Sequence, residues 1–567
     1  MSDPQKPSDE YEIKTSTFRP RRLFVPKPEP KPNILLLMTD QQRSDTINAA
    51  GFDFMQTPNL DRLANEGCLY TNAYTPNPIC MPARHNLLTG LPARYHGFPD
   101  NMPAGAVTRA DLPTLPRILS DHGYDTRGIG KMHFRPPRRH NGFDKREFMS
   151  ELPLYREDDD YAMYLKSVGL GHIQHIHGVR HLLYMVPQRS LIPEEHHATK
   201  WVADRSIDFI RTNAGRRPFF LWSSWIAPHP PFDVPDAWAD LYRGADLPQP
   251  YVSQTPLPTL SEESKVLGDL PNERYIRRMR ELYYAAISCV DHQIGRILEA
   301  LEQARLLDKT LIIFTSDHGG LLGDYGLYQK WHPYDSCSRI PFIVRYPDKV
   351  EAGTVYDDFV DLHDVLPTVL DVAGLDYPGT IPLPGESLLS DTKTKDRDWQ
   401  YVEYSFDNRR WISVRNQAYK YNFFYGGGFE QLFDMRNDPH EATNLLAGQV
   451  TSEIAAIRHE LKSRLLQYEK KQGLEGYTNE DDFKRGAPFT PHPQRNKAFP
   501  RFPGNIMDGA VKAGMNDLFD EILAAVAKEP VVKLRELDIA AWQRAGGFSD
   551  DAIKELLERD DLRHRTV

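Results

Sequence analysis

Short apolar runs that stop abruptly at polar residues limit the folds that this chain can adopt. The first run, Asn33-Ile-Leu-Leu-Leu-Met-Thr39, ends at Asp40. A strand buried on both faces has such a continuous apolar run, and strands of this kind belong to parallel sheets. Similar runs predict further strands at 217–222, 310–315 and 341–346.

Segments with helical spacing of apolar residues alternate with these runs. They predict helices at 57–67, 112–123, 198–212 and 275–304. Alternation of strands and helices is typical of an α/β fold in which helices cover both faces of a large, mostly parallel sheet. Active residues are then expected just beyond the carboxyl ends of the strands.

The pattern changes after about residue 385. Short antiparallel strands are predicted at 400–404, 411–415 and 419–424, followed by a helix at 454–471. The predicted organisation has four parts: an N-terminal arm (1–31), a catalytic α/β domain (32–385), an α+β subdomain (386–472) and a C-terminal extension (473–567). The extension is expected to be partly helical, at 517–528, 532–545 and 549–559, and to serve packing or oligomer contacts.

Bulk properties exclude several classes of protein. A net charge of −10 over 567 residues argues against general nucleic-acid binding, which needs a basic face. No apolar run is long enough to span a membrane, and no secretory leader is visible, so a cytoplasmic location is expected. Four scattered cysteines form neither a disulfide framework nor a Cys-x-x-Cys zinc motif, which fits a reducing compartment. We expect a homo-oligomer.

The segment Cys80-Met-Pro-Ala-Arg84 is the most informative motif. A lone cysteine is usually a small buried hydrophobe, but this one lies in Cys-x-Pro-x-Arg before a helix-like segment that ends at Thr89-Gly90. The motif resembles the signature of the formylglycine-dependent sulfatases of the alkaline phosphatase superfamily. The resemblance implies an alkaline-phosphatase-like α/β fold. It also implies that a separate formylglycine-generating enzyme oxidises Cys80 and that the hydrated aldehyde is the nucleophile.

Other segments resemble the same family, in the same order along the chain. They are Gly123–His133, which resembles the second signature, then Pro228-His229-Pro-Pro231, Ser316-Asp317-His318-Gly319, Lys330 and the segment Glu430–Asn444. Together with Cys80–Arg84 they extend the resemblance over about residues 33–471. The combination predicts a hydrolase that converts a sulfate monoester into an alcohol and inorganic sulfate.

Four residues are candidate ligands of one divalent metal ion: Asp40, Gln41, Asp317 and His318. Alone, Asp40 would be read as a helix cap and His318 as a loop histidine; together, at the ends of two strands, they can converge on a hard cation. Asp-Gln with Asp-His departs from the commonest sulfatase pattern and resembles choline sulfatases and phosphonate monoester hydrolases. The segment 130–134 strengthens the likeness to choline sulfatases. Because one candidate ligand is an imidazole, calcium and manganese are both candidates for the metal.

Cationic and acid–base roles follow from the resemblance. Arg84 would stabilise the nucleophile at Cys80 and contact the acid beside the metal. Lys131 and Lys330 would bind sulfate oxygens, as point charges suited to a tetrahedral anion.

The resemblance also assigns two histidines and an asparagine. His133 would be the base that takes a proton from the diol and releases sulfate. His229, together with Lys330, would bind the bridging oxygen and protonate the leaving group. Asn101 would bind the anion.

Other features have simpler interpretations. The histidine-rich segments 171–178 and 194–197 could suggest a second metal, but a substrate-side insertion over about 158–197 is favoured because no ligand spacing closes a site. The glycines at 426–428 predict a turn between strands rather than a phosphate-binding loop. Trp225, Tyr328 and Trp331 are candidates for a cage around a choline-like leaving group.

Other functions could use the same fold or the same residues. A phosphonate monoester or phosphodiester hydrolase could use the same fold and nucleophile, but those enzymes usually replace the Lys131/His133 pair with hydroxyl side chains. An inactive relative is disfavoured by the complete set of candidate residues. A thiol hydrolase is disfavoured because Arg84 is not a general base. The alcohol half stays open among choline, sugar, aryl and alkyl groups.

Overall fold

The structure is a computed structural model of the chain. It describes residues 31–101, 106–151, 155–180, 187–258, 273–389 and 397–490, together with the single positions Pro153, Ser549, Asp551 and Lys554. The helices predicted at 517–528 and 532–545 therefore lie outside the described residues, and the one predicted at 549–559 is described only at single positions.

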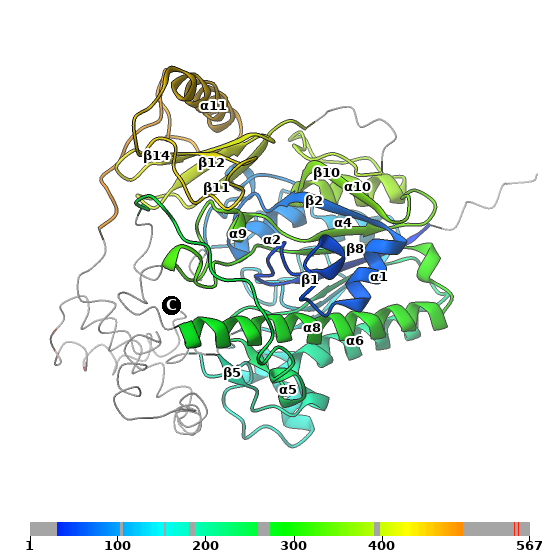
Figure 1. The fold of residues 1–567 in the computed structure, drawn as a ribbon. Helices are drawn as coiled ribbons and strands as arrows, with labels where there is room; N and C mark the ends of the chain where they lie inside the picture. The colour runs from blue at the N-terminus through cyan, green and yellow to red at the C-terminus, as the bar shows by residue number, and fades with distance from the viewer. Residues whose placement is uncertain are drawn as a thin grey trace, which may run out of the picture. The chain divides into compact units, whose positions relative to one another are not determined.

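An eight-stranded sheet forms the centre of the fold (Figure 1). Its strands, in spatial order, are β10 (Thr354–Asp361), β2 (Cys68–Tyr74), β9 (Phe342–Arg345), β8 (Thr310–Ser316), β1 (Asn33–Thr39), β6 (Phe219–Ser224), β3 (Asp125–Gly130) and β4 (Lys145–Phe148). Only β9 runs antiparallel to its neighbours, β2 and β8; the other pairings are parallel. The predicted mostly parallel sheet is confirmed.

Helices cover both faces of this sheet, because successive side chains of a strand point to opposite sides. Leu35 and Leu37 of β1 pack in a cluster with α1 (Pro58–Glu66), α6 (Ala198–Asn213) and α8 (Glu273–Gln303). Ile34, Leu36 and Met38 pack in a second cluster with α2 (Cys80–Thr89), α4 (Leu115–Asp121) and α10 (Val365–Ala373). Figure 1 shows α6 and α8 on one side of the sheet and α4 and α10 on the other.

The predicted helices form close to their expected positions. They are α1 (Pro58–Glu66), α4 (Leu115–Asp121), α6 (Ala198–Asn213), α8 (Glu273–Gln303) and α11 (Ser452–Lys471). The second begins later than predicted, at Leu115, since Thr114 is extended at its N-cap and a proline occupies the first turn. The remaining helices are α2 (Cys80–Thr89), α3 (Ala93–His96), α5 (Asp160–Ser167), α7 (Asp236–Ala239), α9 (Asp335–Ser338) and α10 (Val365–Ala373).

Several strands of the large sheet were not predicted, and β2 shows why. Thr71 and Asn72 interrupt its apolar pattern, which hides the strand in the sequence. In the fold, the Thr71 hydroxyl donates to the Tyr356 carbonyl (3.1 Å), and the Asn72 amide donates to the Asp357 carbonyl (2.8 Å). These polar side chains are satisfied by residues more than 280 positions away, a pairing that local pattern does not reveal.

The C-terminal part forms a second sheet, as predicted. Its antiparallel strands are β11 (Gln400–Tyr404), β12 (Trp411–Arg415), β13 (Tyr419–Phe424) and β14 (Phe429–Asp434), and α11 packs against it through Leu461 and Leu465. A two-stranded sheet joins β5 (Gln188–Arg189) to β7 (Asp233–Val234). The domain boundaries at 385 and 472 stay predictions. Among the described residues, no helix is both long and apolar enough to cross a membrane.

Candidate active site

Four neighbouring strands, β8, β1, β6 and β3, bring most of the candidate residues to one edge of the sheet. Thr39 aligns with Ser316, and Gly130 aligns with Ser224, so these parallel strands end level with one another. The residues that follow them are Asp317 and His318 after β8, Asp40 and Gln41 after β1, His229 after β6, and Lys131 and His133 after β3.

Gly130 allows β3 to end close against β6. Its φ is +92°, and a Cβ at this position would lie 2.0 Å from the Ser224 carbonyl oxygen. A side chain would therefore push the two strand ends apart. The glycine keeps Lys131, the next residue, beside the end of β6.

Cys80 is the first residue of α2, which is buried along its whole length. Arg84, one turn later, donates from Nε to Asp317 (2.9 Å) and from Nη2 to Asp40 (3.1 Å). Its Nη1 donates to the Lys131 carbonyl (2.6 Å) and to the Ser224 hydroxyl (2.9 Å). Arg84 thus joins α2 to the ends of four strands and fixes where the cysteine lies.

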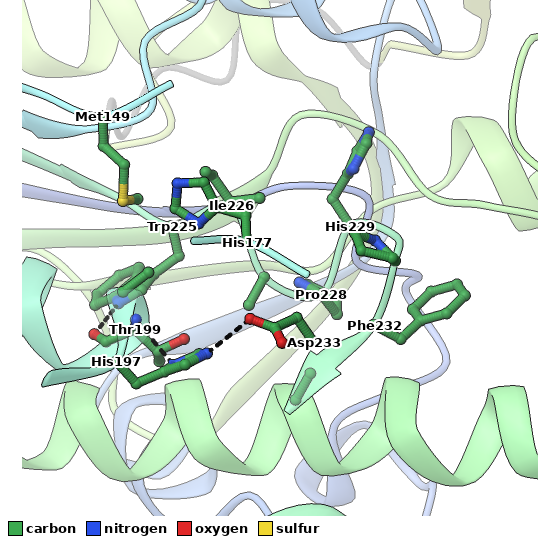
Figure 2. A pocket seen from close by; sticks show the side chains of 14 residues that line it. Met149, His177, His197, Thr199, Trp225, Ile226, Pro228, His229, Phe232 and Asp233 are labelled. Carbon is green, nitrogen blue, oxygen red and sulfur yellow. Dashed lines mark hydrogen bonds and ion pairs between the residues drawn. The ribbon is translucent and has the colours of Figure 1, made fainter. Parts of the chain in front are cut away.

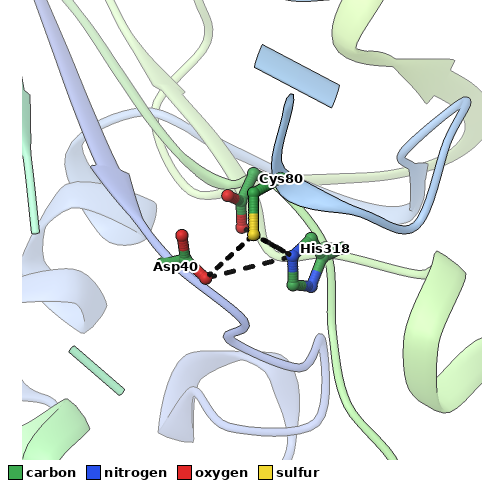
Figure 3. A group of neighbouring side chains, drawn as sticks. Asp40, Cys80 and His318 are labelled. Carbon is green, nitrogen blue, oxygen red and sulfur yellow. Dashed lines mark hydrogen bonds and ion pairs between the residues drawn. The ribbon is translucent and has the colours of Figure 1, made fainter. Parts of the chain in front are cut away.

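Asp40, Cys80, Asp317 and His318 form one buried cluster, and each offers a ligand atom within 4.8 Å of the others. Figure 3 shows Asp40, Cys80 and His318 converging, with Sγ 3.3 Å from Nε2 of His318 and 3.8 Å from Oδ1 of Asp40. Nδ1 of His318 donates to the Gly319 carbonyl (2.8 Å). Its Nε2 therefore keeps a lone pair directed at the carboxylates, as a metal ligand requires.

Gln41 lies beside this cluster in an unusual backbone conformation. Its φ is +65°, a region that non-glycine residues rarely occupy. Its backbone N–H donates to Asp317 (3.1 Å), and its amide oxygen accepts from Lys330 (3.2 Å). A Cβ on Gly320 would lie 2.8 Å from Nε2 of Gln41, so this glycine makes room for the amide.

The two acids of the cluster differ in how readily they ionise. Burial, reinforced by Asp40, raises the pKa of Asp317 to about 6. Burial also opposes ionisation of Asp40, but Lys131, His229 and Lys330 lower the pKa of that carboxyl well below its usual range. A cation between the acids would stabilise both as anions. The two carboxylates, one amide oxygen and one imidazole therefore fit a hard divalent ion such as calcium or manganese.

Two lysines also approach Cys80. Nζ of Lys330 is 3.2 Å from Sγ, and Nζ of Lys131 is 3.8 Å from Sγ and pairs with Asp40. Burial opposes ionisation of the thiol, but these lysines lower its pKa well below the usual range. The site therefore favours negative charge at position 80.

His133 and His229 flank Cys80. Burial lowers the pKa of His133 to about 4, and its Nδ1 is buried without a hydrogen-bond partner among the described residues. Nδ1 of His229 donates to the Pro230 carbonyl (2.8 Å), which leaves Nε2 to interact with Nζ of Lys330 at 3.0 Å. Burial, helped by Lys330, lowers the pKa of His229. Both rings are thus neutral and can exchange protons with groups at the cysteine.

Asn101 lies at the edge of the site, where its side chain is exposed. Its Oδ1 accepts from the backbone N–H of Met81 (3.0 Å), in the first turn of α2. This contact uses the amide oxygen and leaves the NH₂ group as a donor.

Two charged residues at the site were not predicted: Glu151 and Arg180. Glu151 contacts Lys131 through one carboxylate oxygen, and through the other it accepts from Nη2 of Arg180 (2.6 Å). Neither belongs to a motif. Glu151 follows β4, so a prediction of that strand would have placed it at the same edge as the other candidates.

The histidine-rich segments lie beside His229 but form no second metal cluster within the described parts of the chain. Figure 2 shows His177, His197 and Asp233 around a cavity of about 30 Å³; His197 is paired with Asp233 at 3.4 Å. Both histidines are buried, and Nδ1 of His197 accepts from the backbone at the start of α6. Their positions indicate a role in packing the insertion.

The aromatic residues considered for a choline cage are placed differently. Trp225 and Tyr328 are buried in hydrophobic clusters, and the Trp225 indole donates to the Thr199 carbonyl (2.9 Å). Trp331 is partly buried, and its carbonyl accepts from Trp411 (2.7 Å). A cage built from these three residues is therefore not supported. The glycines at 426–428 form the turn between β13 and β14, as predicted.

Comparisons with known proteins agree with this geometry. The family model described as "Sulfatase" matches residues 32–375, and that described as "N-sulphoglucosamine sulphohydrolase, C-terminal" matches residues 323–471. An arylsulfatase of Clostridium perfringens is 32% identical over 485 residues, which cover 81% of this chain and 98% of the relative. A choline-sulfatase of Rhizobium meliloti is 31% identical over 435 residues, which cover 73% and 84%.

A solved structure shows the same fold. The phosphonate monoester hydrolase of Agrobacterium radiobacter superposes with a TM-score of 0.64 at 24% identity, covering 81% of this chain and 100% of that one.

Proposed function

The chain belongs to the sulfatase family of sulfuric ester hydrolases, and we propose that it cleaves a sulfate monoester by means of a nucleophile made from Cys80. The predicted resemblance to the sulfatase family is confirmed, and a choline-sulfatase is among the relatives. One observation carries the mechanism: a metal-type cluster, Asp40/Asp317/His318, and the ammonium groups of two lysines all lie close to Sγ of Cys80.

The metal-type cluster would hold a metal ion, and Cys80 would carry a modification made after synthesis of the chain. Asp40, Gln41, Asp317 and His318 would hold one divalent cation, which supplies positive charge beside the transferring sulfate and the nucleophile. Cys80 would be converted to formylglycine by a formylglycine-generating enzyme, and the hydrated aldehyde supplies an oxygen nucleophile. Arg84 donates to Asp317 (2.9 Å) and to Asp40 (3.1 Å) and so holds both carboxylates in place.

The residues around Cys80 would neutralise the sulfate group and move protons. Lys131 and Lys330 reach the position of the nucleophile, so they can bind the sulfate oxygens whose charge grows during transfer. The exposed amide of Asn101 adds a neutral donor at the edge. His133, neutral because burial lowers its pKa to about 4, suits the role of the base that acts at the nucleophile.

The His229–Lys330 contact would serve the leaving group. With Nδ1 held by the Pro230 carbonyl, Nε2 of His229 shares a proton with Nζ of Lys330 at 3.0 Å. This proton can pass to the bridging oxygen as the ester bond breaks, which matters most for alcohols that leave poorly as anions.

Hydrolysis of phosphonate monoesters or phosphodiesters is the alternative. Lys131 and His133 both lie at Cys80 and are not replaced by hydroxyl side chains, which favours sulfate. A thiol–imidazole pair is suggested by the 3.3 Å contact between Cys80 and His318. The same imidazole, however, completes the cluster with two acids, an arrangement suited to a cation. A cytoplasmic location and a homo-oligomeric state remain predictions.

A direct comparison of substrates tests the proposal. The protein, co-expressed with a formylglycine-generating enzyme and supplied with calcium or manganese, is assayed with an aryl sulfate and the matching aryl phosphonate monoester. We expect kcat/KM to favour the sulfate by orders of magnitude, and peptide mass spectrometry to find an aldehyde at residue 80. Preference for the phosphonate would make the alternative the function.

Metal dependence is tested separately. Chelation is expected to abolish turnover, and calcium or manganese to restore it with one ion per chain. Full activity in a metal-free preparation would contradict the assignment of Asp40, Gln41, Asp317 and His318 as ligands.

A further inference from the structure

Glu151 and Arg180 form an ion pair beside His229. Oε2 of Glu151 is 3.8 Å from Nε2 of His229, which the proposed mechanism places at the bridging oxygen, and 2.6 Å from Nη2 of Arg180. The side chains of Glu151 and Arg180 are 14% and 8% exposed. The Glu151 carboxylate also lies within 4.8 Å of the ligand atoms of Cys80 and His133. The pair therefore leads from the nucleophile, past the proposed general acid, to Arg180, and an alcohol half that leaves beside His229 would meet it.

The protein holds both residues firmly. The backbone N–H of Ser150, next to Glu151, donates to Asp159 (2.6 Å), whose other oxygen caps α5 through Ala162 (2.8 Å). Nη1 of Arg180 donates to the Pro230 carbonyl (2.9 Å), in the loop that carries His229. The segment after β4 and the insertion thus present a prearranged acceptor and donor beside the general acid, as a specificity site requires.

The charges around this pair decide which leaving group it suits. An ammonium group would meet Glu151 but also Arg180, Lys131 and Lys330, so net repulsion is expected. A second anionic group would meet the carboxylate of Glu151. Neutral hydroxyl groups can accept from the guanidinium and donate to the carboxylate without adding charge.

We propose that Glu151 and Arg180 are specificity residues that hydrogen-bond hydroxyl groups of the alcohol half, so that the substrate is the sulfate ester of a polyhydroxylated alcohol. This inference rests on the proposed sulfatase function. It extends that function by narrowing the choice of leaving group. An ester without hydroxyl groups would cover the ion pair and form no hydrogen bond with it. Sites built to hydrogen-bond a hydroxyl strongly reject analogues that lack it.

Matched substrates test the inference without altering the protein. The metal-loaded, formylglycine-containing enzyme is assayed with glucose 6-, 3- and 2-sulfates, and with cyclohexylmethyl and cyclohexyl sulfates, which keep the ring and the primary or secondary ester but lack hydroxyls. We expect kcat/KM for at least one glucose sulfate to exceed that of its hydroxyl-free counterpart by about 10²-fold or more. No preference for any hydroxylated ester would overturn the inference.

Variants then assign the preference to the pair. Glu151→Gln and Arg180→Lys are expected to lower the glucose-sulfate to cyclohexyl-sulfate ratio at least about 10-fold. Arg189→Lys is a matched control in the same insertion, where Arg189 pairs with Asp236 and Asp240 outside the site, and it should keep the ratio. Equal losses on both kinds of ester in the Glu151 and Arg180 variants would show that the pair only positions Lys131, and would overturn the inference.

A third substrate separates this failure from failure of the proposed function. Wild-type turnover of 4-nitrophenyl sulfate, whose leaving group carries no neighbouring hydroxyl, tests sulfatase activity alone. Activity on it without any hydroxyl preference rejects only the specificity inference. Absence of sulfate-ester turnover with all substrates rejects the proposed function, and the inference with it.

Discussion

Two buried groups of charges in this protein use the same kinds of residues for different ends. One surrounds Cys80. The other, which we call the junction cluster, consists of Tyr74, Asp335, Arg415, Lys420 and Glu441 and joins α9 to the C-terminal sheet. Lys420 and Glu441 have side chains 1% and 0% exposed, so they are as buried as the residues of the active site.

The junction cluster satisfies itself. The two oxygens of Asp335 are 2.9 Å from Arg415 and 2.9 Å from Lys420, and Lys420 also reaches Glu441 at 2.8 Å. The second oxygen of Glu441 accepts from the backbone N–H of Asp335 (2.6 Å). Two cations therefore face two acids with opposite charge in every direction.

The active site is arranged differently. Arg84 is shared by Asp40 and Asp317, and Lys131 pairs with Asp40 and Glu151. Lys330 lies 3.2 Å from Sγ of Cys80, the atom around which these groups gather. Buried charge alone therefore does not mark a catalytic site; its convergence on a reactive atom does.

Replacement of Cys80 should have the largest effect, which is a loss of catalytic activity without a loss of stability. Cys80→Ala is expected to lower kcat at least about 10⁴-fold while the melting temperature and metal content stay close to wild type. Cys289→Ala, a buried cysteine in α8, serves as the control and should keep activity. Retained turnover in Cys80→Ala would remove the nucleophile from the proposed site.

Asp335→Asn should have the next largest effect, on stability instead of catalysis. Loss of this carboxylate leaves Arg415 and Lys420 without their shared partner, and a cost of about 3–5 kcal/mol in the free energy of unfolding is expected. Urea unfolding measures it, with Asp236→Asn, a surface partner of Arg189, as the control. A change below about 1 kcal/mol would mean that the junction cluster contributes little.

His229→Ala tests the proposed proton donor of the active site. Alkyl sulfates should lose about 10²–10³-fold in kcat/KM and activated aryl sulfates far less, because only alkoxide leaving groups require the proton. His197→Ala is a neighbouring control, since that buried histidine pairs with Asp233 and caps α6. Equal losses for both ester types in His229→Ala would exclude a general-acid role.

The smallest effect should come from Glu441. Burial raises its pKa to about 7, although Lys420 opposes the shift. As pH rises, the unfolded chain releases this proton first, near 4.5, so the stabilising contribution is complete below that pH and is lost as pH approaches 7. Glu441→Gln cannot titrate.

This difference can be measured by unfolding both proteins between pH 4.5 and 8. The stability of wild type relative to Glu441→Gln should fall by about 1–3 kcal/mol across this range and then level off. A difference that grows with pH would show that Lys420 stabilises the ionised carboxylate more than burial opposes it.

Local pattern sufficed to predict much of the fold. The continuous apolar runs of β1 and β8 and the spacing in α6 and α8 are visible because a buried strand or helix face dictates residue type at each position. The same logic placed Asp40 and Asp317 at one sheet edge, because parallel strands end together. Strand β2 was missed because its polar side chains are satisfied by distant backbone groups.

The sequence by itself determined the fold class, the family and the set of candidate residues, since these depend on residue type and order. Only the tertiary structure decided which charges are neighbours. It brought Glu151 and Arg180 to the site and showed that Trp225 and Tyr328 lie in the core. The physical reason is that electrostatic and hydrogen-bonding energies depend on distances of a few ångströms, which sequence separation does not set.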